Sequence, residues 1–303
     1  MNPRAPRIAL VTGADAKFML MAGALRQSLL DAGWKEALHI CDFGLTDRQA
    51  GSLRDAGLLL PRPRGLAAGL HPFYYKASLI DYVADLDFDL LVWIDCDMIA
   101  VDDPVVALEG LATDLATDGK SAALCADAGV ESIADACGRL EMQPFREALQ
   151  RSEIDEQRPY LNTGFVAIND RRALGAWRDL AFALPVHALF EQNAFNLLAY
   201  EGRCPSLLVP AARWNVHGPL LSSARIAPDG AAWALEHRAF LLHATSAQTS
   251  QHEIHEGAVT LAGGTFHGQL KLFRNPGLRR LQVSALNRWS VDPIARACNA
   301  PAT

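Results

Sequence analysis

Short apolar runs alternate with longer amphipathic segments along most of the chain, and this alternation predicts its secondary structure. The apolar runs have the length of strands, which we expect at 8–12, 38–41, 58–60, 90–94, 122–125, 165–168, 207–209 and 240–242. Helices are expected between them, at 18–32, 46–56, 73–84, 133–149, 172–182 and 189–200. This order is typical of an α/β fold in which a largely parallel sheet has helices on both faces.

The run 90–94 is the clearest single element. It has five consecutive apolar residues and stops abruptly at Asp95. A strand that is apolar on both faces is typical of the middle of a covered sheet. Open α/β sheets bind ligands beyond the carboxyl ends of such strands, so the residues after Ile94 are the first candidates for a ligand-binding site.

No internal repeat or low-complexity linker divides the chain, so we expect one catalytic domain over 1–255 and a less regular extension over 256–303. The extension is expected to be partly helical and to cover the edge of the domain, and contact with an anionic lipid surface is the alternative. After Glu256 its charges are mostly positive, with a single acid, Asp292, against Lys271, Arg274, Arg279, Arg280, Arg288 and Arg296.

The composition is that of a globular protein: 303 residues, 50% of them hydrophobic and 20% charged. The net charge of −6 disfavours a nucleic-acid-binding protein, which needs a cationic field. Six cysteines without a CxxC pair exclude a zinc ribbon and are typical of a reducing cytoplasm. No apolar run is long enough for a signal peptide core or a membrane span. We therefore expect a cytoplasmic protein, with the extension as the part that would contact the inner face of a membrane.

Asp95 and Asp97 follow the central strand, and a turn after Asp95 would bring both carboxylates together. Two hard oxygen ligands suit Mg²⁺ or Mn²⁺ bridging a diphosphate. The alternative is that the two acids only open a turn. His243, after the strand 240–242, could add a nitrogen ligand that favours Mn²⁺, or it could be a hydrogen-bonded core histidine. His252 and His255 are expected to be solvated.

An Asp-x-Asp after hydrophobic residues also opens the motif of the haloacid-dehalogenase phosphatases, in which the first aspartate is the nucleophile. That motif normally belongs to the first strand and is followed two residues on by Thr or Val. Here three strand–helix units precede it, and the residue is Ile99. A phosphotransferase using Asp95 therefore ranks second, and a nucleotide-sugar-binding protein without turnover is the third hypothesis.

Three residues in the first part of the chain are candidates for contact with a nucleotide. Gly13 ends a strand where the backbone could approach a flat base, or it is an ordinary glycine of a strand end. Asp15 could accept hydrogen bonds from a nucleoside or cap the helix expected from Phe18. Lys76 lies near the start of the helix expected over 73–84, where the helix dipole opposes it. It therefore needs a diphosphate or a carboxylate of the metal motif nearby, unless it is solvated.

The second half of the chain offers groups that suit a sugar. The amides of Asn162 and Gln192 can donate and accept at once and so bind hydroxyl groups, and Gly164 permits a close backbone approach. Glu191 could stabilise an oxocarbenium-like centre. The alternatives are a turn at 162–164 and an exposed pair on a helix surface at 191–192.

Taken in order, these segments resemble the GT-A nucleotide-sugar glycosyltransferases, most of all the family of the glycogenins and the bacterial lipopolysaccharide galactosyl- and glucosyltransferases (glycosyltransferase family 8). The resemblance runs from about residue 8 to 250. The segments are Val11-Thr12-Gly13-Ala14-Asp15, Tyr75-Lys76-Ala77-Ser78-Leu79-Ile80, Asp95-Cys96-Asp97, Tyr160-Leu161-Asn162-Thr163-Gly164-Phe165, Glu191-Gln192-Asn193-Ala194-Phe195-Asn196, Arg213-Trp214-Asn215 and Leu242-His243-Ala244.

The resemblance implies a Rossmann-like three-layer α/β/α sandwich with a mixed, mostly parallel sheet. It implies metal-dependent transfer of a sugar, with UDP-hexose as the expected donor, to a hydroxyl of a saccharide or similar acceptor, with retention. Asp95, Asp97 and His243 would hold Mn²⁺ or Mg²⁺, and Gln192 would lie nearest the anomeric carbon. The implied catalytic residues are Gln192, Glu191 and Asp97, and the implied donor contacts are Thr12, Gly13, Asp15, Lys76, Asp95, Asn162 and Gly164.

The chain departs from the family at two places. Asn193 stands where the family has a second acid beside the sugar. Residues 244–249 do not follow the family's Gly-x-x-Lys-Pro-Trp, so the lysine that clasps the leaving diphosphate is missing. Lys271 could take its place only if the extension folds back, which we do not expect.

Overall fold

The computed structural model describes residues 4–245 and 251–299. Seven strands form one mixed, mostly parallel sheet in the order β3-β2-β1-β4-β7-β6-β8, which confirms the expected α/β class. The chain divides into two compact units that alternate along the sequence. The first comprises the residues up to Ala9 with Pro63–Trp93 and Ala107–Ala211, and the second comprises Leu10–Arg62, Ile94–Val106 and the chain from Ala212 onward.

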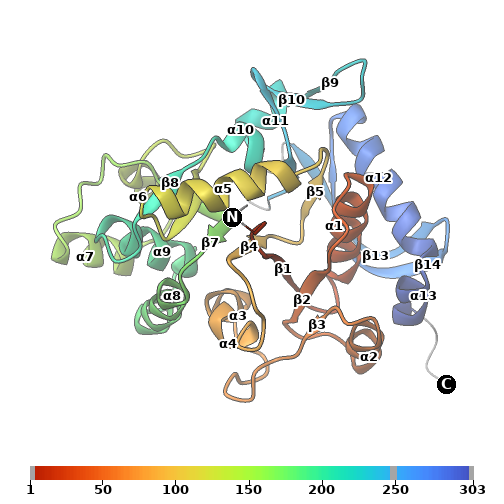
Figure 1. The fold of residues 1–303 in the computed structure, drawn as a ribbon, viewed down its shortest axis with the longest axis horizontal. Coiled ribbons are helices and arrows are strands. Elements are labelled where there is room, and N and C mark those ends of the chain that lie inside the picture. The colour runs from red at the N-terminus through yellow and green to blue at the C-terminus, as the bar shows by residue number, and fades with distance from the viewer. Residues whose placement is uncertain (1–3, 246–250, 300–303) are drawn as a thin grey trace. The chain divides into compact units, whose positions relative to one another are not determined.

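The second unit contains the first strands of the sheet, drawn in red and orange in Figure 1. The strands β1, β2 and β3 are parallel neighbours, because the helices α1 and α2 return the chain between them. Thr46 caps α2 with a capping box, which agrees with the expected start of this helix. The bounds are β1 (Ile8–Ala14), α1 (Met19–Asp31), β2 (Leu38–Asp42), α2 (Asp47–Asp55) and β3 (Leu59–Leu60).

A short strand that the sequence pattern does not reveal follows the Asp-x-Asp segment. This strand, β5 (Met98–Ala100), pairs antiparallel with β12 (Leu241–His243). Between them in sequence, the second unit also forms a small antiparallel sheet in the order β11-β10-β9. The strands of this sheet are β9 (Arg225–Ile226), β10 (Ala232–Ala234) and β11 (His237–Arg238). Two short helices precede it, α10 (Ala211–Trp214) and α11 (Pro219–Ser223).

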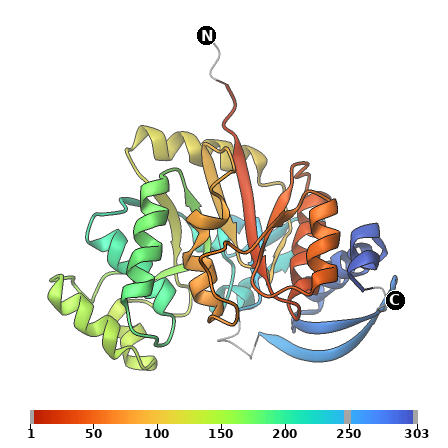
Figure 2. The same ribbon diagram turned by 90° about the horizontal axis from the view of Figure 1, so that it is seen from below.

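The C-terminal part is regular, so the expectation of a less regular extension was wrong. It forms a long antiparallel hairpin of β13 (His252–Leu261) and β14 (Gly264–Phe273), which Figure 2 shows as a curved ribbon. The boundary expected after 255 falls inside β13. Most of β13 is exposed, so no apolar run marks it. Two helices follow, α12 (Pro276–Val291) and α13 (Pro293–Asn299).

This C-terminal part completes a hydrophobic core of the second unit. Phe266, Leu286 and Trp289 are buried in one cluster with residues of α1 such as Leu20. Trp289 packs directly over Gly23 of α1, where a Cβ atom would lie 2.1 Å from the indole Nε1. The approach of α1 to α12 therefore requires a glycine at this position.

The first unit contains the remaining strands of the sheet, of which β6 is antiparallel to β7 and parallel to β8. The strand β7 begins at Leu161, so Asn162-Thr163-Gly164 lies inside a strand and the turn alternative was wrong. The bounds are β4 (Leu90–Ile94), β6 (Ala122–Ala126), β7 (Leu161–Ile168) and β8 (Ser206–Leu208).

The helices of the first unit differ from the expected ones in three places. The segment 73–84 forms two short helices that meet at Ser78, and 133–149 is interrupted at 140–142. A further helix, α5, was missed, although Leu108, Leu111 and Leu115 recur at helical spacing and are buried. The bounds are α3 (Pro72–Ala77), α4 (Leu79–Tyr82), α5 (Val105–Thr117), α6 (Ile133–Arg139), α7 (Gln143–Arg151), α8 (Arg171–Ala183) and α9 (Phe190–Tyr200). Within 4–245 and 251–299, none of the helices has the length and apolar character needed to cross a membrane.

Candidate functional site

Strand pairing within the second unit builds the predicted metal site. Asp95 directly follows β4, and the chain then turns, with the Met98 amide donating to the Asp95 carbonyl at 3.0 Å. Asp97 therefore comes just before β5. In the antiparallel pairing of β5 with β12, His243 lies opposite Met98, and the Ala244 amide donates to the Asp97 carbonyl at 3.0 Å. The register thus places the imidazole beside the two carboxylates.

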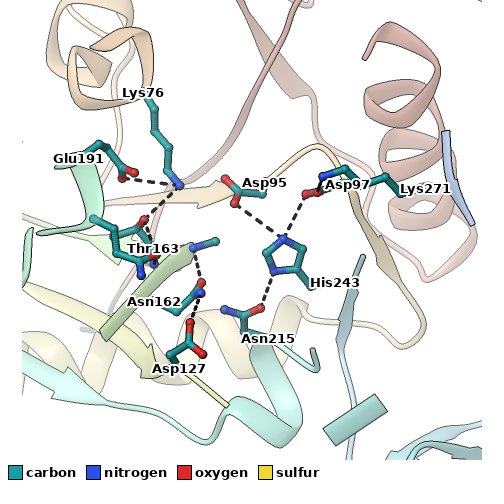
Figure 3. A network of polar contacts seen from close by, with 12 residues as sticks. Lys76, Asp95, Asp97, Asp127, Asn162, Thr163, Glu191, Asn215, His243 and Lys271 are labelled. Atoms are coloured by element: carbon teal, nitrogen blue, oxygen red, sulfur yellow. Dashed lines mark hydrogen bonds and ion pairs between the residues drawn. The ribbon is translucent and has the colours of Figure 1, made fainter. Parts of the chain in front are cut away.

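Asp95, Asp97 and His243 offer ligand atoms that all lie within 4.8 Å of one another. His243 Nε2 is 3.1 Å from Asp97 Oδ1 and 3.8 Å from Asp95 Oδ2. Figure 3 shows the imidazole directed toward both carboxylates. The side chains of Asp97 and His243 are buried, whereas that of Asp95 is 27% exposed. The three residues that the sequence singles out are thus brought together, and solvent reaches them at Asp95.

Asn215 determines which nitrogen of His243 faces the carboxylates. Its side-chain oxygen lies 2.8 Å from His243 Nδ1, and it is completely buried. An amide oxygen only accepts, so Nδ1 holds the proton and donates it. Nε2 then faces the two carboxylates, so either a second proton or a cation must lie between this nitrogen and the carboxylate oxygens. A buried imidazole held by its other nitrogen is the usual form of a metal-ligating histidine, so the donor set fits a hard divalent ion.

Lys271 of β14 reaches this cluster, so the expectation that it does not fold back was wrong. Its Nζ lies 2.5 Å from Asp97 Oδ2, and both side chains are buried. Desolvation would raise the pKa of Asp97, but the charges of Lys271 and His243 outweigh it and hold that pKa well below its usual range. Desolvation likewise opposes the charged form of Lys271, and the Asp97 carboxylate raises the pKa of Lys271 nevertheless.

A second histidine of the hairpin is also buried. His252 is 1% exposed and its Nε2 has no hydrogen-bond partner among the described residues, so the expectation that it is solvated was wrong. Desolvation lowers the pKa of His252, and the positive charge of Lys271 adds to this. His255 is exposed, as expected.

Of the residues expected at the nucleotide, Thr12, Gly13 and Asp15 lie in or just after β1, and the last two contact other parts of this chain. Thr12 is fully buried, and its Oγ1 has no hydrogen-bond partner in the part of the chain that the structure describes. A Cβ atom on Gly13 would lie 2.3 Å from the ring of Phe43, so an aromatic ring of this chain already requires the glycine. Asp15 Oδ1 accepts from the amides of Lys17 and Phe18, both at 2.9 Å, in the turn that precedes α1. The N-cap residue of α1 is Phe18 and no side chain caps this helix, so the alternative of Asp15 as its N-cap was wrong. Their contacts with a donor stay predictions.

Lys76 belongs to a buried polar cluster in the first unit. It is 7% exposed and lies in the last turn of α3, so both its solvated alternative and its expected place near a helix start were wrong. Its Nζ donates to Thr163 Oγ1 at 3.2 Å and lies 3.6 Å from Glu191 Oε1. The indole of Trp93 adds a cation–π contact, with 5.4 Å from Nζ to the ring centroid. Among the described residues, Glu191 thus supplies the anion that was expected from a diphosphate or from the metal motif.

Glu191 and Gln192 are both buried in the first turn of α9, so the alternative of an exposed helix pair was wrong. Gln192 Oε1 accepts from the Thr163 amide at 3.2 Å. Sequence reasoning missed Thr163 as a member of this cluster, although it lies between two of the predicted residues. Its hydroxyl accepts from Lys76, as Figure 3 shows, and its amide donates to Gln192, so Thr163 connects the lysine to the glutamine.

Asn162 is anchored at both ends of its amide. Its Nδ2 donates to Asp127 Oδ2 and its Oδ1 accepts from the Gly164 amide, each at 2.8 Å. Asp127, just after β6, was also missed, because no local pattern distinguishes it from other acids at strand ends. Contact of Asn162 and Gly164 with a sugar stays a prediction.

The structure gives a reason for the asparagine at position 193, where the resembled family has a second acid. Its Oδ1 accepts from the Tyr160 hydroxyl at 2.7 Å, and its Nδ2 donates to the Ala188 carbonyl at 3.0 Å. A carboxylate could not make the second of these bonds. The other departure falls partly on 246–250, which lie outside the described residues.

Comparison with known proteins identifies glycosyltransferases among solved structures. No family model matches the chain, and no curated protein does. The bifunctional glycosyltransferase WbbM is similar at 15% identity and a TM-score of 0.46, over 70% of this chain and 40% of that one. The galactosyltransferase LgtC with donor and acceptor sugar analogues shows 16% identity and a TM-score of 0.44, over 68% and 74% of the two chains. Mouse xyloside xylosyltransferase 1 shows 11% identity and a TM-score of 0.49, over 80% and 99%. All three scores are low, and the function proposed below depends on the residues of the site.

Proposed function

We propose that this protein is a metal-dependent glycosyltransferase that moves a sugar from a nucleotide diphosphate sugar to a hydroxyl group of a saccharide or similar acceptor. The observation that carries the proposal is the convergence of Asp95, Asp97 and His243 within 4.8 Å. These are the three residues that the ordered motifs of the sequence select as metal ligands. UDP-hexose is the donor that we propose, by the same resemblance.

A bound Mn²⁺ or Mg²⁺ would neutralise the charge that develops on the departing diphosphate. Two features of the protein position the side chains of the cluster for such an ion. Asn215 fixes the ring of His243, and the turn 95–98 keeps the two carboxylates close together. Because Asp95 is partly exposed, oxygen atoms of solvent or substrate can reach the cluster there.

The buried cluster of the first unit supports roles for Glu191 and Gln192 at the sugar. Glu191 Oε1 lies 3.6 Å from the ammonium nitrogen of Lys76. Because of this neighbouring positive charge, Glu191 is better suited to carry a fixed negative charge than to donate a proton. A fixed negative charge can stabilise an oxocarbenium-like centre. We propose transfer with retention, in which the acceptor attacks from the face that the leaving group vacates, so that no strong protein base is needed.

The cellular location of the protein and the extent of its catalytic domain are further parts of the proposal. All six cysteines are free, which supports the reducing cytoplasm. The C-terminal hairpin brings Lys271 to Asp97, which supports a catalytic unit that extends beyond residue 255. Contact of the basic helices with a membrane remains a hypothesis.

The proposal is tested by measuring UDP release from a panel of UDP-sugars with Mn²⁺, with and without candidate saccharide acceptors. Asp95→Asn and Asp97→Asn should each lower the rate by roughly 100- to 1000-fold, the effect of removing a dominant electrostatic group. Asp118→Asn, at an exposed position far from the cluster in sequence, is the matched control and should leave the rate unchanged.

Calorimetry of UDP with and without Mn²⁺ distinguishes the other hypotheses. Metal-dependent binding of UDP without turnover of any donor would indicate a binding protein. Hydrolysis of an aryl phosphate with a covalent phosphate on Asp95 would indicate a phosphotransferase. Either result would contradict the proposal.

A further inference from the structure

The position of Lys271 at the carboxylate cluster is fixed by several elements of the second unit. On β14 it lies opposite Ile254 of β13. The side chain of Gln282 of α12 makes two hydrogen bonds to the backbone here, donating to the Lys271 carbonyl at 2.7 Å and accepting from the Phe273 amide at 3.1 Å. The ring of Phe18 lies under the ammonium, with 5.4 Å from Nζ to the centroid. This arrangement differs from a surface ion pair, whose long side chains are loosely held.

The two oxygens of Asp97 have different partners. Oδ1 faces His243 Nε2 at 3.1 Å, on the side where Asp95 also lies. Oδ2 accepts from the ammonium of Lys271 at 2.5 Å. One oxygen is therefore directed toward the position of a metal ion, and the other is held by a cation that belongs to the protein.

We propose that Lys271 is a resident counter-ion that lowers the affinity of this cluster for divalent cations and lowers it most for Ca²⁺. The inference rests on the metal site of the proposed function and adds a selectivity to it. Two physical effects support it. The two oxygens of one carboxylate share a carbon atom, so an ion on Oδ1 lies within a few ångströms of the ammonium on Oδ2 and is repelled by it.

The second effect concerns coordination. Ca²⁺ takes many oxygen ligands and often binds a carboxylate through both oxygens, whereas Mg²⁺ requires fewer protein ligands and keeps its waters. Because Lys271 occupies Oδ2, Asp97 can offer an incoming ion a single oxygen. The lysine thus acts on the ion through Asp97, as a positioning residue.

The test measures metal binding rather than activity. Mn²⁺ affinity is determined from the electron paramagnetic resonance signal of free Mn²⁺, and Ca²⁺ affinity from competition, for the wild type and Lys271→Met. The variant should bind Mn²⁺ about tenfold more tightly, because a like charge next to the ion is removed. It should gain more for Ca²⁺, so its preference for Mn²⁺ over Ca²⁺ falls. Lys35→Met, at an exposed lysine of the same unit, controls for the loss of one positive charge and should change neither affinity.

The possible outcomes distinguish a failure of the role of Lys271 from a failure of the proposed metal site. Equal or weaker Mn²⁺ binding by a folded Lys271→Met, or an unchanged preference over Ca²⁺, overturns the role of Lys271 and leaves the metal site intact. Binding by the variant but not by the wild type supports the counter-ion and contradicts the metal dependence proposed for the native chain. Absence of binding in both overturns both proposals. If Lys271→Met does not fold, Lys271→Gln, which can still donate to Asp97 without a charge, gives the same comparison.

Discussion

The pair of Lys76 and Glu191 allows a quantitative test of the buried cluster in the first unit. The two side chains are 8% and 2% exposed, and their charged atoms are 3.6 Å apart. At this distance and an effective dielectric constant of about 20, their attraction is about 5 kcal/mol. Lys76→Met removes the positive charge at little change in volume and leaves the carboxylate of Glu191 in a site with little access to water.

Protonation of Glu191 limits the cost of this substitution. With an ordinary glutamate pKa of about 4.3, keeping the group neutral at pH 7 costs about 3.7 kcal/mol, at about 1.4 kcal/mol per pH unit. We therefore expect Lys76→Met to lower the free energy of unfolding by about 3 to 4 kcal/mol at pH 7. In this variant the folded state binds the proton more tightly than the unfolded state, so the loss grows as the pH rises and shrinks to about 1 kcal/mol at pH 5.

Urea unfolding at pH 5 and pH 7 measures both values, for the wild type, the single variants and Lys76→Met/Glu191→Gln. The double variant should recover much of the loss at pH 7, because it removes both charges of the pair. Arg64→Met, at an exposed cation of the same unit, is the control and should change the stability by less than about 0.5 kcal/mol. A Lys76→Met protein as stable as the wild type, or one whose loss does not depend on pH, would refute the buried ion pair.

Three further predictions concern the second unit. Asn215→Ala removes the partner of His243 Nδ1 and should weaken Mn²⁺ binding by about 10-fold or more in calorimetry, and unchanged affinity would contradict the assigned ring orientation. Gly23→Ala places a methyl group 2.1 Å from Trp289 Nε1 and should lower the free energy of unfolding by about 1 to 3 kcal/mol, whereas a neutral effect in urea would show that the two helices can separate. The pKa of Asp97 lies below its usual range, so the stability that its ionised form contributes is present above about pH 4 and is lost as the pH falls below it. Acid titration of the unfolding free energy should therefore show a smaller loss for Asp97→Asn than for the wild type, and parallel curves would refute this.

Local sequence patterns predicted most of the elements of the sheet and several of the helices. The apolar run 90–94 coincides with β4, and Thr46 caps α2 as its position suggested. The Asp-x-Asp segment was recognisable because its two acids directly follow a strand that is buried on both faces. The hairpin 252–273 could not be predicted in this way, because most residues of β13 face solvent and leave no apolar period.

By itself, the sequence determined the periodicity of the strands, the position of the two aspartates and the residue types that suit a metal ion. These features depend on neighbours within a few residues, so they can be read along the chain. Only the tertiary structure decided that His243 lies beside Asp97, that Lys271 pairs with the same carboxylate, and that Lys76 is buried against Glu191. Those contacts join residues more than 100 positions apart. They arise from strand pairing and helix packing, whose free energy depends on complementary surfaces and on charges that must be paired when buried, and no local pattern records such a partner.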